Sequence, residues 1–150
     1  MGYYSIAQIS KLFGLSDRTL RSRLKDGTLV GEKINGKWMI SSERIYDFIS
    51  SPQTIPTLRT KVDGVYSRMF TSSDNGRKAS EYMLLCRFHD AIDYESEKVI
   101  DLMMKASENS DIHFYRFVQK RDLIYIIKGE YSVVRKVINE LYSIYIGIKE

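Results

Sequence analysis

Cysteine and proline are scarce in this chain of 150 residues, which contains one cysteine and two prolines. The single Cys86 excludes an internal disulfide framework and any zinc site built from several cysteines. No apolar run is long enough to cross a bilayer, and the chain does not begin with a basic segment followed by a hydrophobic block. These absences predict a cytoplasmic protein with no membrane partner.

Signatures of the common enzyme classes are also lacking. The sequence has no glycine-rich phosphate loop, no zincin histidine pair and no nucleophile elbow. Cys86, His89 and His113 are the candidates for a metal site, but residues three apart on a strand point to opposite faces. The sequence therefore predicts no enzymatic activity, no metal and no cofactor.

What the chain does have is a globular composition with an uneven distribution of charge. Hydrophobic residues make up 43% and the net charge is +4. Residues 1–50 carry eight Lys and Arg against five Asp and Glu, whereas residues 81–150 carry ten against twelve. The basic excess lies in the amino-terminal half, where it favours a polyanionic partner.

Two consecutive short helices are predicted near the amino terminus. Ser5 and Gln8 have the spacing of a capping box, and Gly14 suits a left-handed helix end. In the second helix, capped by Ser16, Leu20 and Leu24 form the buried stripe. Helical spacing places cations and a hydroxyl on the opposite side, namely Arg18, Arg21, Ser22 and Lys25.

A hairpin follows the second helix. Asn35-Gly36 is the strongest short signal for a two-residue type I′ turn, here between predicted strands Thr28 to Ile34 and Lys37 to Ile40. In that register Lys33 lies opposite Trp38. A third helix then returns Ile45, Phe48 and Ile49 to the core.

The two helices and the hairpin carry a recognisable combination, Gly14-Leu15-Ser16 with Arg18-Thr19-Leu20-Arg21 and then Gly36-Lys37-Trp38. Over about the first third of the chain, it resembles the MerR-like and excisionase-like winged helix-turn-helix family. The family implies a recognition helix in the major groove of DNA and a wing on the backbone or minor groove. The resemblance and the exposed faces together predict these DNA-contacting residues: Ser16, Arg18, Thr19, Arg21, Ser22, Lys25, Lys33, Asn35 and Lys37.

The roles within this set differ. Arg18 or Arg21 is expected to donate two hydrogen bonds to guanine, and the sequence does not choose between them. Ser16, Lys25 and the wing lysines are expected to meet phosphates. The competing interpretation is that the basic face is only solvated. Trp38 is expected to pack under the wing rather than to touch DNA.

A break from Ser51 to Pro56 ends this amino-terminal head, residues 1–51. Residues 52–80 form a basic connector that is partly helical or flexible, with a helix predicted over Leu58 to Phe70. Its cations either follow phosphates beside the head or are simply solvated; they are Arg59, Lys61, Arg68, Arg77 and Lys78.

Residues 81–150 are predicted to form an α+β domain for dimerisation or effector binding. The pattern predicts a strand over Tyr82 to His89 and a helix that begins at Asp93 or Ser96 and ends at about Ser107. A hairpin of Ile112 to Val118 with Leu123 to Lys128 follows, and then a helix from about Tyr131. Ser143 to Ile148 either continues that helix or adds an edge strand. This β-α-β-β-α order, with a possible final β, suggests a ferredoxin-like α/β sandwich, so the fold class of the whole chain is α+β.

Aromatic residues are numerous for a sheet that has one face without helices. Either they form a homodimer interface or most belong to a single core, and dimerisation is the favoured alternative. The residues are Tyr82, Phe88, Phe114, Tyr115, Phe117 and Tyr125. No small-molecule effector is specified by the sequence.

The sequence thus predicts a sequence-specific protein that binds double-stranded DNA, as a dimeric transcriptional regulator. One alternative is an architectural role in excision or plasmid partition. Another is a protein-interaction or effector-sensing module that the head localises.

Overall fold

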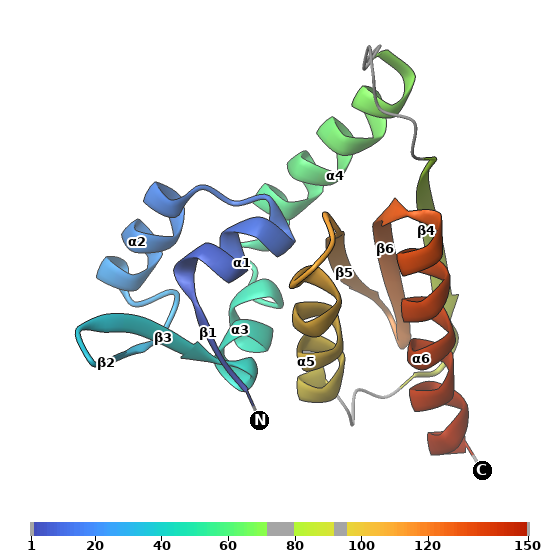
Figure 1. The fold of residues 1–150 in the computed structure, drawn as a ribbon. Helices are drawn as coiled ribbons and strands as arrows, with labels where there is room; N and C mark the ends of the chain where they lie inside the picture. Colours follow the sequence, from blue (N-terminus) through green and yellow to red (C-terminus); the bar gives the residue numbers. More distant parts are fainter. Residues whose placement is uncertain (1, 72–79, 92–95, 150) are drawn as a thin grey trace.

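The computed structural model describes residues 2–71, 80–91 and 96–149 (Figure 1). It mixes helices and strands, which confirms the predicted α+β class. The elements of the head are β1 (Tyr3–Ser5), α1 (Ile6–Phe13), α2 (Asp17–Asp26), β2 (Glu32–Ile34), β3 (Lys37–Ser41) and α3 (Ser42–Ile49).

The predicted caps define both ends of α1. The Ser5 hydroxyl accepts the Gln8 backbone N–H at 3.2 Å, and the Gln8 side chain accepts the Ser5 N–H at 2.8 Å. At the other end, Gly14 adopts the left-handed conformation, with φ of 65°. This confirms the capping box and the helix end.

The hairpin turn is also as predicted, although its first strand is shorter. Asn35 and Gly36 have φ of 52° and 78°, and Lys33 lies opposite Trp38. The strand begins at Glu32 rather than at Thr28. A third strand that the sequence did not indicate, β1, pairs with β3, which gives the sheet order β1-β3-β2.

The second part contains α4 (Ile55–Thr71), β4 (Glu81–Phe88), α5 (Ser96–Ser107), β5 (His113–Gln119), β6 (Asp122–Glu130) and α6 (Tyr131–Lys149). Its strands are antiparallel in the order β4-β6-β5. Helices α5 and α6 cover the same face of this sheet (Figure 1). The possible final strand is not formed, because α6 runs on to Lys149.

Helix α4 begins earlier than predicted, with Pro56 in its first turn, a position where a missing N–H costs no helical hydrogen bond. Leu58 and Val65 are buried, whereas Met69 is 37% exposed. The helix contacts β5, and the Arg59 guanidinium lies 5.7 Å from the centre of the Phe117 ring.

The head and the second part share a continuous core. Phe13 of α1 packs on Phe114 of β5, with ring centres 6.2 Å apart. Lys11 donates to the Ser107 carbonyl, and Tyr4 donates to Asp101. Burial, together with the Asp101 carboxylate, raises the pKa of Tyr4. Helices α1 and α3 both contact α5.

This packing corrects the expectation of a free aromatic face for three of the six sheet aromatics, whereas Phe88 and Phe117 are half-buried and Tyr82 is 45% exposed. Phe114, Tyr115 and Tyr125 are fully buried within the chain. Phe114 and Tyr125 stack at 5.5 Å under the helices, whereas Tyr115 points to the opposite face by strand alternation.

In the part of the chain that the structure describes, no helix is long and apolar enough to cross a membrane.

Candidate nucleic-acid interface

Helix α2 has the two faces that the sequence predicts. Leu20 is fully buried and Leu24 is half-buried, so this side anchors the helix in the head. Gly27 ends the helix, with φ of 83°. The outward side exposes Arg18, Arg21, Ser22 and Lys25. The helix therefore holds its polar side chains on a buried hydrophobic base.

The first turn of α2 uses two of the predicted contact residues for its own cap. The Ser16 hydroxyl accepts the Thr19 backbone N–H at 3.0 Å and lies 2.8 Å from the Thr19 hydroxyl. Ser16 is exposed, but Thr19 is half-buried. Both hydroxyls are thus engaged in the helix start, and Ser16 is the better placed of the two to meet a phosphate.

Two ion pairs orient cations along α2. Arg21 donates to Asp17 at 2.7 Å, with the side chains 58% and 59% exposed. Arg23 lies 3.4 Å from Asp26 at the last turn, and hydrogen bonds from Thr28 hold the Asp26 pKa below its usual value. Within the described residues, Arg18 and Lys25 form no ion pair. An exposed pair such as Arg21–Asp17 is weak enough to exchange for a DNA acceptor.

The hairpin supplies the second set of predicted residues. Lys33, Asn35 and Lys37 are all exposed. The Lys33 ammonium lies 5.3 Å from the centre of the Trp38 ring, across the strand pair. Trp38 is half-buried, so it supports the hairpin while its exposed part carries the lysine.

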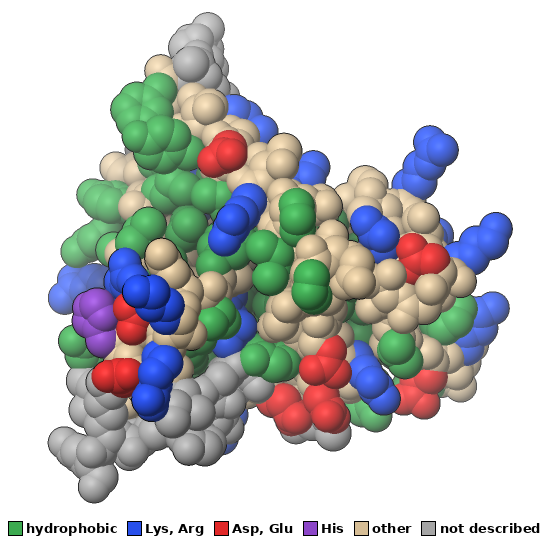
Figure 2. Space-filling model, turned by 180° about the vertical axis from the view of Figure 1, so that it is seen from behind, with side chains coloured by type: hydrophobic (Ala, Val, Ile, Leu, Met, Phe, Trp, Pro, Cys, Tyr) green, Lys and Arg blue, Asp and Glu red, His purple; other side chains and the backbone are tan. Residues whose placement is uncertain are grey.

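These two elements lie at the same end of the molecule, away from the β4-β6-β5 sheet (Figure 1). Lys and Arg side chains project into solvent from that end in the space-filling view (Figure 2). The structure therefore brings the helical and hairpin cations into one region.

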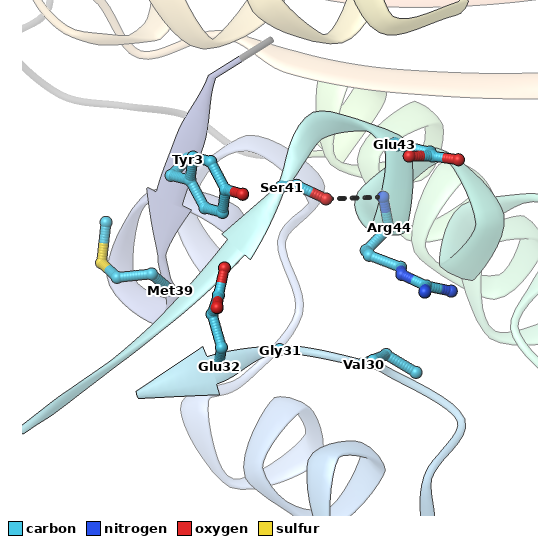
Figure 3. A pocket seen from close by; sticks show the side chains of 8 residues that line it. All are labelled: Tyr3, Val30, Gly31, Glu32, Met39, Ser41, Glu43 and Arg44. Atoms are coloured by element: carbon cyan, nitrogen blue, oxygen red, sulfur yellow. Dashed lines mark hydrogen bonds between the residues drawn. The ribbon is translucent and has the colours of Figure 1, made fainter. Parts of the chain in front are cut away.

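A pocket of about 330 Å³ bounds this region on the outer face of the small sheet (Figure 3). Its lining includes two carboxylates, Glu32 and Glu43, beside Arg44 at the start of α3. Ser41 caps that helix, accepting the Arg44 N–H at 3.2 Å. Two carboxylates oppose phosphate binding, so the pocket marks an edge of the candidate interface.

Two residues near the interface were not predicted. Arg23 shares α2 with the predicted cations, but it is half-buried and lies 3.4 Å from Asp26. Ile34 is 42% exposed beside the hairpin turn, where an apolar side chain can contact sugar or a thymine methyl. Neighbouring residues on a strand point to opposite faces of the sheet. Lys33 shares a face with the half-buried Trp38, so alternation would have placed Ile34 on the outer face.

The connector cations take separate positions. Arg59 lies over Phe117 of the sheet, whereas Lys61 and Arg68 are exposed on α4. Arg77 and Lys78 fall outside the described residues. The described residues contain no group of three or more His, Cys, Asp or Glu that could hold a metal ion.

Comparisons with protein families, with characterised proteins and with solved structures found no match to this chain.

Proposed function

We propose that this chain is a sequence-specific double-stranded DNA-binding protein that acts in the cytoplasm as a dimeric transcriptional regulator. Helix α2 is the recognition helix in the major groove, and the β2–β3 hairpin is a wing on the backbone or minor groove. The observation that carries the proposal is that α2 and the β2–β3 hairpin lie at the same end of the molecule and both expose cations (Figure 1). Leu20 fixes α2 in the core of the head.

The proposed fold classification has a similar basis. Two short helices joined at Gly14 and followed by a hairpin support a winged helix-turn-helix head. The antiparallel order β4-β6-β5, with α5 and α6 on one face, supports a ferredoxin-like sandwich that lacks a fourth strand in the described residues.

The dimensions of α2 suit the major groove. A helix with its side chains is about 10–12 Å in diameter, and the groove is about 12 Å wide. The 10 residues of α2 extend about 15 Å along the helix axis. Arg18 and Arg21 leave from adjacent outward positions, and either can donate two parallel hydrogen bonds to guanine. Lys25, Lys33, Lys37 and the exposed Ser16 are suited to phosphates.

The first test is the salt dependence of binding to genomic fragments. Each neutralised phosphate contributes a slope of about −0.9 to log K against log salt, so several lysine contacts give a steep decline. Fluorescence anisotropy at several salt concentrations measures it. A flat response would contradict DNA binding.

The second test separates base reading from backbone contact. Arg21→Ala is expected to cost about 1–3 kcal/mol at the preferred sequence and to relax the preference at one base. Lys37→Ala is expected to weaken all sequences equally and to reduce the salt slope by about one. Selection of bound sequences with each variant provides the comparison.

A matched control is Arg135→Ala, an exposed arginine on α6 that is expected to change neither property. If Arg21→Ala weakens all sequences uniformly, Arg21 is a backbone contact and base reading falls to Arg18.

Two alternative functions are distinguished by other observations. A footprint over one palindrome supports a regulator, whereas a long protected array supports excision or partition. An effector-sensing role is supported by a pocket of about 440 Å³ between α5 and α6 whose lining includes Lys105 and Lys136. Thermal stabilisation by a ligand that Lys105→Ala abolishes would favour that role.

A further inference from the structure

Strand β4 forms an uncovered edge of the large sheet. Its eight residues all pair with β6, and within the described residues no strand lies on its other side. The opposite edge strand, β5, is in contact with α1 and α4. Natural edges carry a proline, a bulge, a short strand or charged side chains that prevent pairing. β4 has none of the first three, and its charged residues, Glu81 and Arg87, flank an uncharged stretch.

The side chains of β4 alternate between two faces. Tyr82, Leu84 and Cys86 lie on the helix side, with Leu84 and Cys86 partly buried against the core. The other face presents, in order, Glu81, Met83, Leu85 and Arg87. Leu85 is 65% exposed, an unusual position for leucine in the middle of a strand. This face therefore carries an acid at one end, a base at the other end and two apolar residues between them.

We propose that β4 pairs antiparallel with β4 of a second copy of this chain, about a two-fold axis at Leu84. The two sheets then join into one of six strands. On the axis Leu84 lies opposite Leu84. On the open face, Met83 lies opposite Leu85 of the second copy, and Glu81 lies opposite its Arg87.

The charges select this register from its neighbours. Directly opposed residues in antiparallel strands share a face, so a two-fold register changes in steps of two residues. A shift by two residues in one direction places Arg87 opposite Met83, and a shift by two residues in the other direction places Glu81 opposite Leu85. The register centred on Leu84 matches acid with base at both ends and apolar with apolar between them.

Existing contacts leave these side chains available. Glu81 receives Lys128 at 3.4 Å, and Arg87 donates to Asp122 at 2.8 Å. The Glu81 and Arg87 side chains are 50% and 43% exposed. A guanidinium has five N–H donors, so Arg87 can serve a second carboxylate. Pairing also satisfies the outward backbone N–H and C=O groups of β4 and covers Leu85.

The pairing places the two heads at opposite ends of the dimer, because each head packs beside β5. Six strands span about 24 Å between the outermost strands. An α1 layer of about 8–10 Å on each side brings the separation above one turn of DNA, about 34 Å. This consequence rests on the proposed function and predicts half-sites more than one helical turn apart. The pairing itself requires no DNA.

Charge reversal tests the pairing in the full chain without DNA. Sedimentation at micromolar protein is expected to show a dimer for the unmodified chain and monomers for Glu81→Arg and for Arg87→Glu, each of which sets like charges opposite each other. An equal mixture of the two variants is expected to return to dimer mass, since acid then meets base at both ends. Glu140→Arg, an exposed reversal on α6, is the matched control and is expected to stay dimeric.

Circular dichroism establishes that each variant is folded. An unmodified monomer, a dimer that neither reversal disrupts, or a mixture that stays monomeric overturns the proposal. If the chain is a monomer and binds an extended peptide along β4, the partner of this edge is a different protein. A dimer that fails to bind DNA contradicts the DNA-binding function and leaves the pairing intact. A monomer that binds DNA contradicts the pairing and the dimeric state and leaves DNA binding intact.

Discussion

At the scale of single residues, Arg116 is a buried cation between the sheet and the head. It is 4% exposed, and its guanidinium lies 4.8 Å from the centre of the Tyr46 ring. It also donates to the Tyr46 hydroxyl at 3.3 Å and to the Ser50 hydroxyl at 3.4 Å. A residue of β5 is thus held by residues in and just after α3.

Arg116→Ala is expected to lower the free energy of unfolding by about 2 kcal/mol, because the packed stem and the contact with Tyr46 are both lost. Arg116→Met retains most of the stem and removes a charge whose desolvation opposes folding, so its loss should be smaller. Urea midpoints measure both variants. Equal losses would show that the charge, rather than the stem, provides the stabilisation.

His113 gives the chain a pH dependence of stability. Burial, with smaller effects from Lys128 and Arg68, lowers its pKa below the usual 6.5, although Asp111 acts in the opposite direction. The unfolded state therefore binds the proton more readily, so stability falls as pH drops below about 6.5 and continues to fall to the folded-state pKa. His113→Gln is expected to flatten this decline in urea titrations between pH 7.5 and 5. An unchanged slope would assign the dependence to other groups.

At the scale of elements, the left-handed glycines that end α1 and α2 allow a direct comparison. A Cβ on Gly14 would lie 3.4 Å from the Tyr115 hydroxyl, an ordinary contact, and one on Gly27 would meet nothing within 4 Å. Backbone strain is therefore the main cost at both positions, and each Ala variant is expected to lose about 1–2 kcal/mol. Gly27→Asn should lose less, because Asn tolerates this conformation. Thermal unfolding compares the three variants, and a much larger loss at Gly14 would reveal a tighter joint with β5.

Elements specified by a few neighbouring residues could be predicted from the sequence. The Ser5 capping box and the Asn35-Gly36 turn depend on local chemistry and formed as expected. Strand β1 was missed because it forms by pairing with β3, a segment distant in the sequence, which places Tyr3 opposite Ser41. A strand of three residues is too short to show an alternation of apolar and polar residues in the sequence.

The candidate interface was predictable to a similar degree. Helical spacing correctly identified the exposed side of α2, but it did not show that Thr19 would turn into the cap. The Asp17–Arg21 pair has the four-residue spacing of a helical ion pair and was readable from the sequence. Which aromatic side chains of the sheet would be covered was not readable, because alternation assigns a face without showing what packs against it. Tyr115, for example, is covered although it faces away from α5 and α6.

At the scale of the whole molecule, the shared core predicts that head and sheet unfold together. Phe114 stacks on Tyr125 within the sheet and packs on Phe13 of the head. The chain has one tryptophan, Trp38, which lies in the hairpin of the head. Its fluorescence therefore reports the head, whereas far-ultraviolet circular dichroism reports the helices and strands of the whole chain.

Phe114→Ala is expected to cost about 3–5 kcal/mol and to shift both urea transitions by the same amount, because the cavity lies where the two parts meet. Val118→Ala, at a 52% exposed position of the same region, should change either transition by no more than about 0.5 kcal/mol. Coincident transitions indicate one cooperative unit. If the Trp38 transition keeps its midpoint while the circular dichroism transition moves, the head folds on its own and its contacts with α5 and β5 only position it.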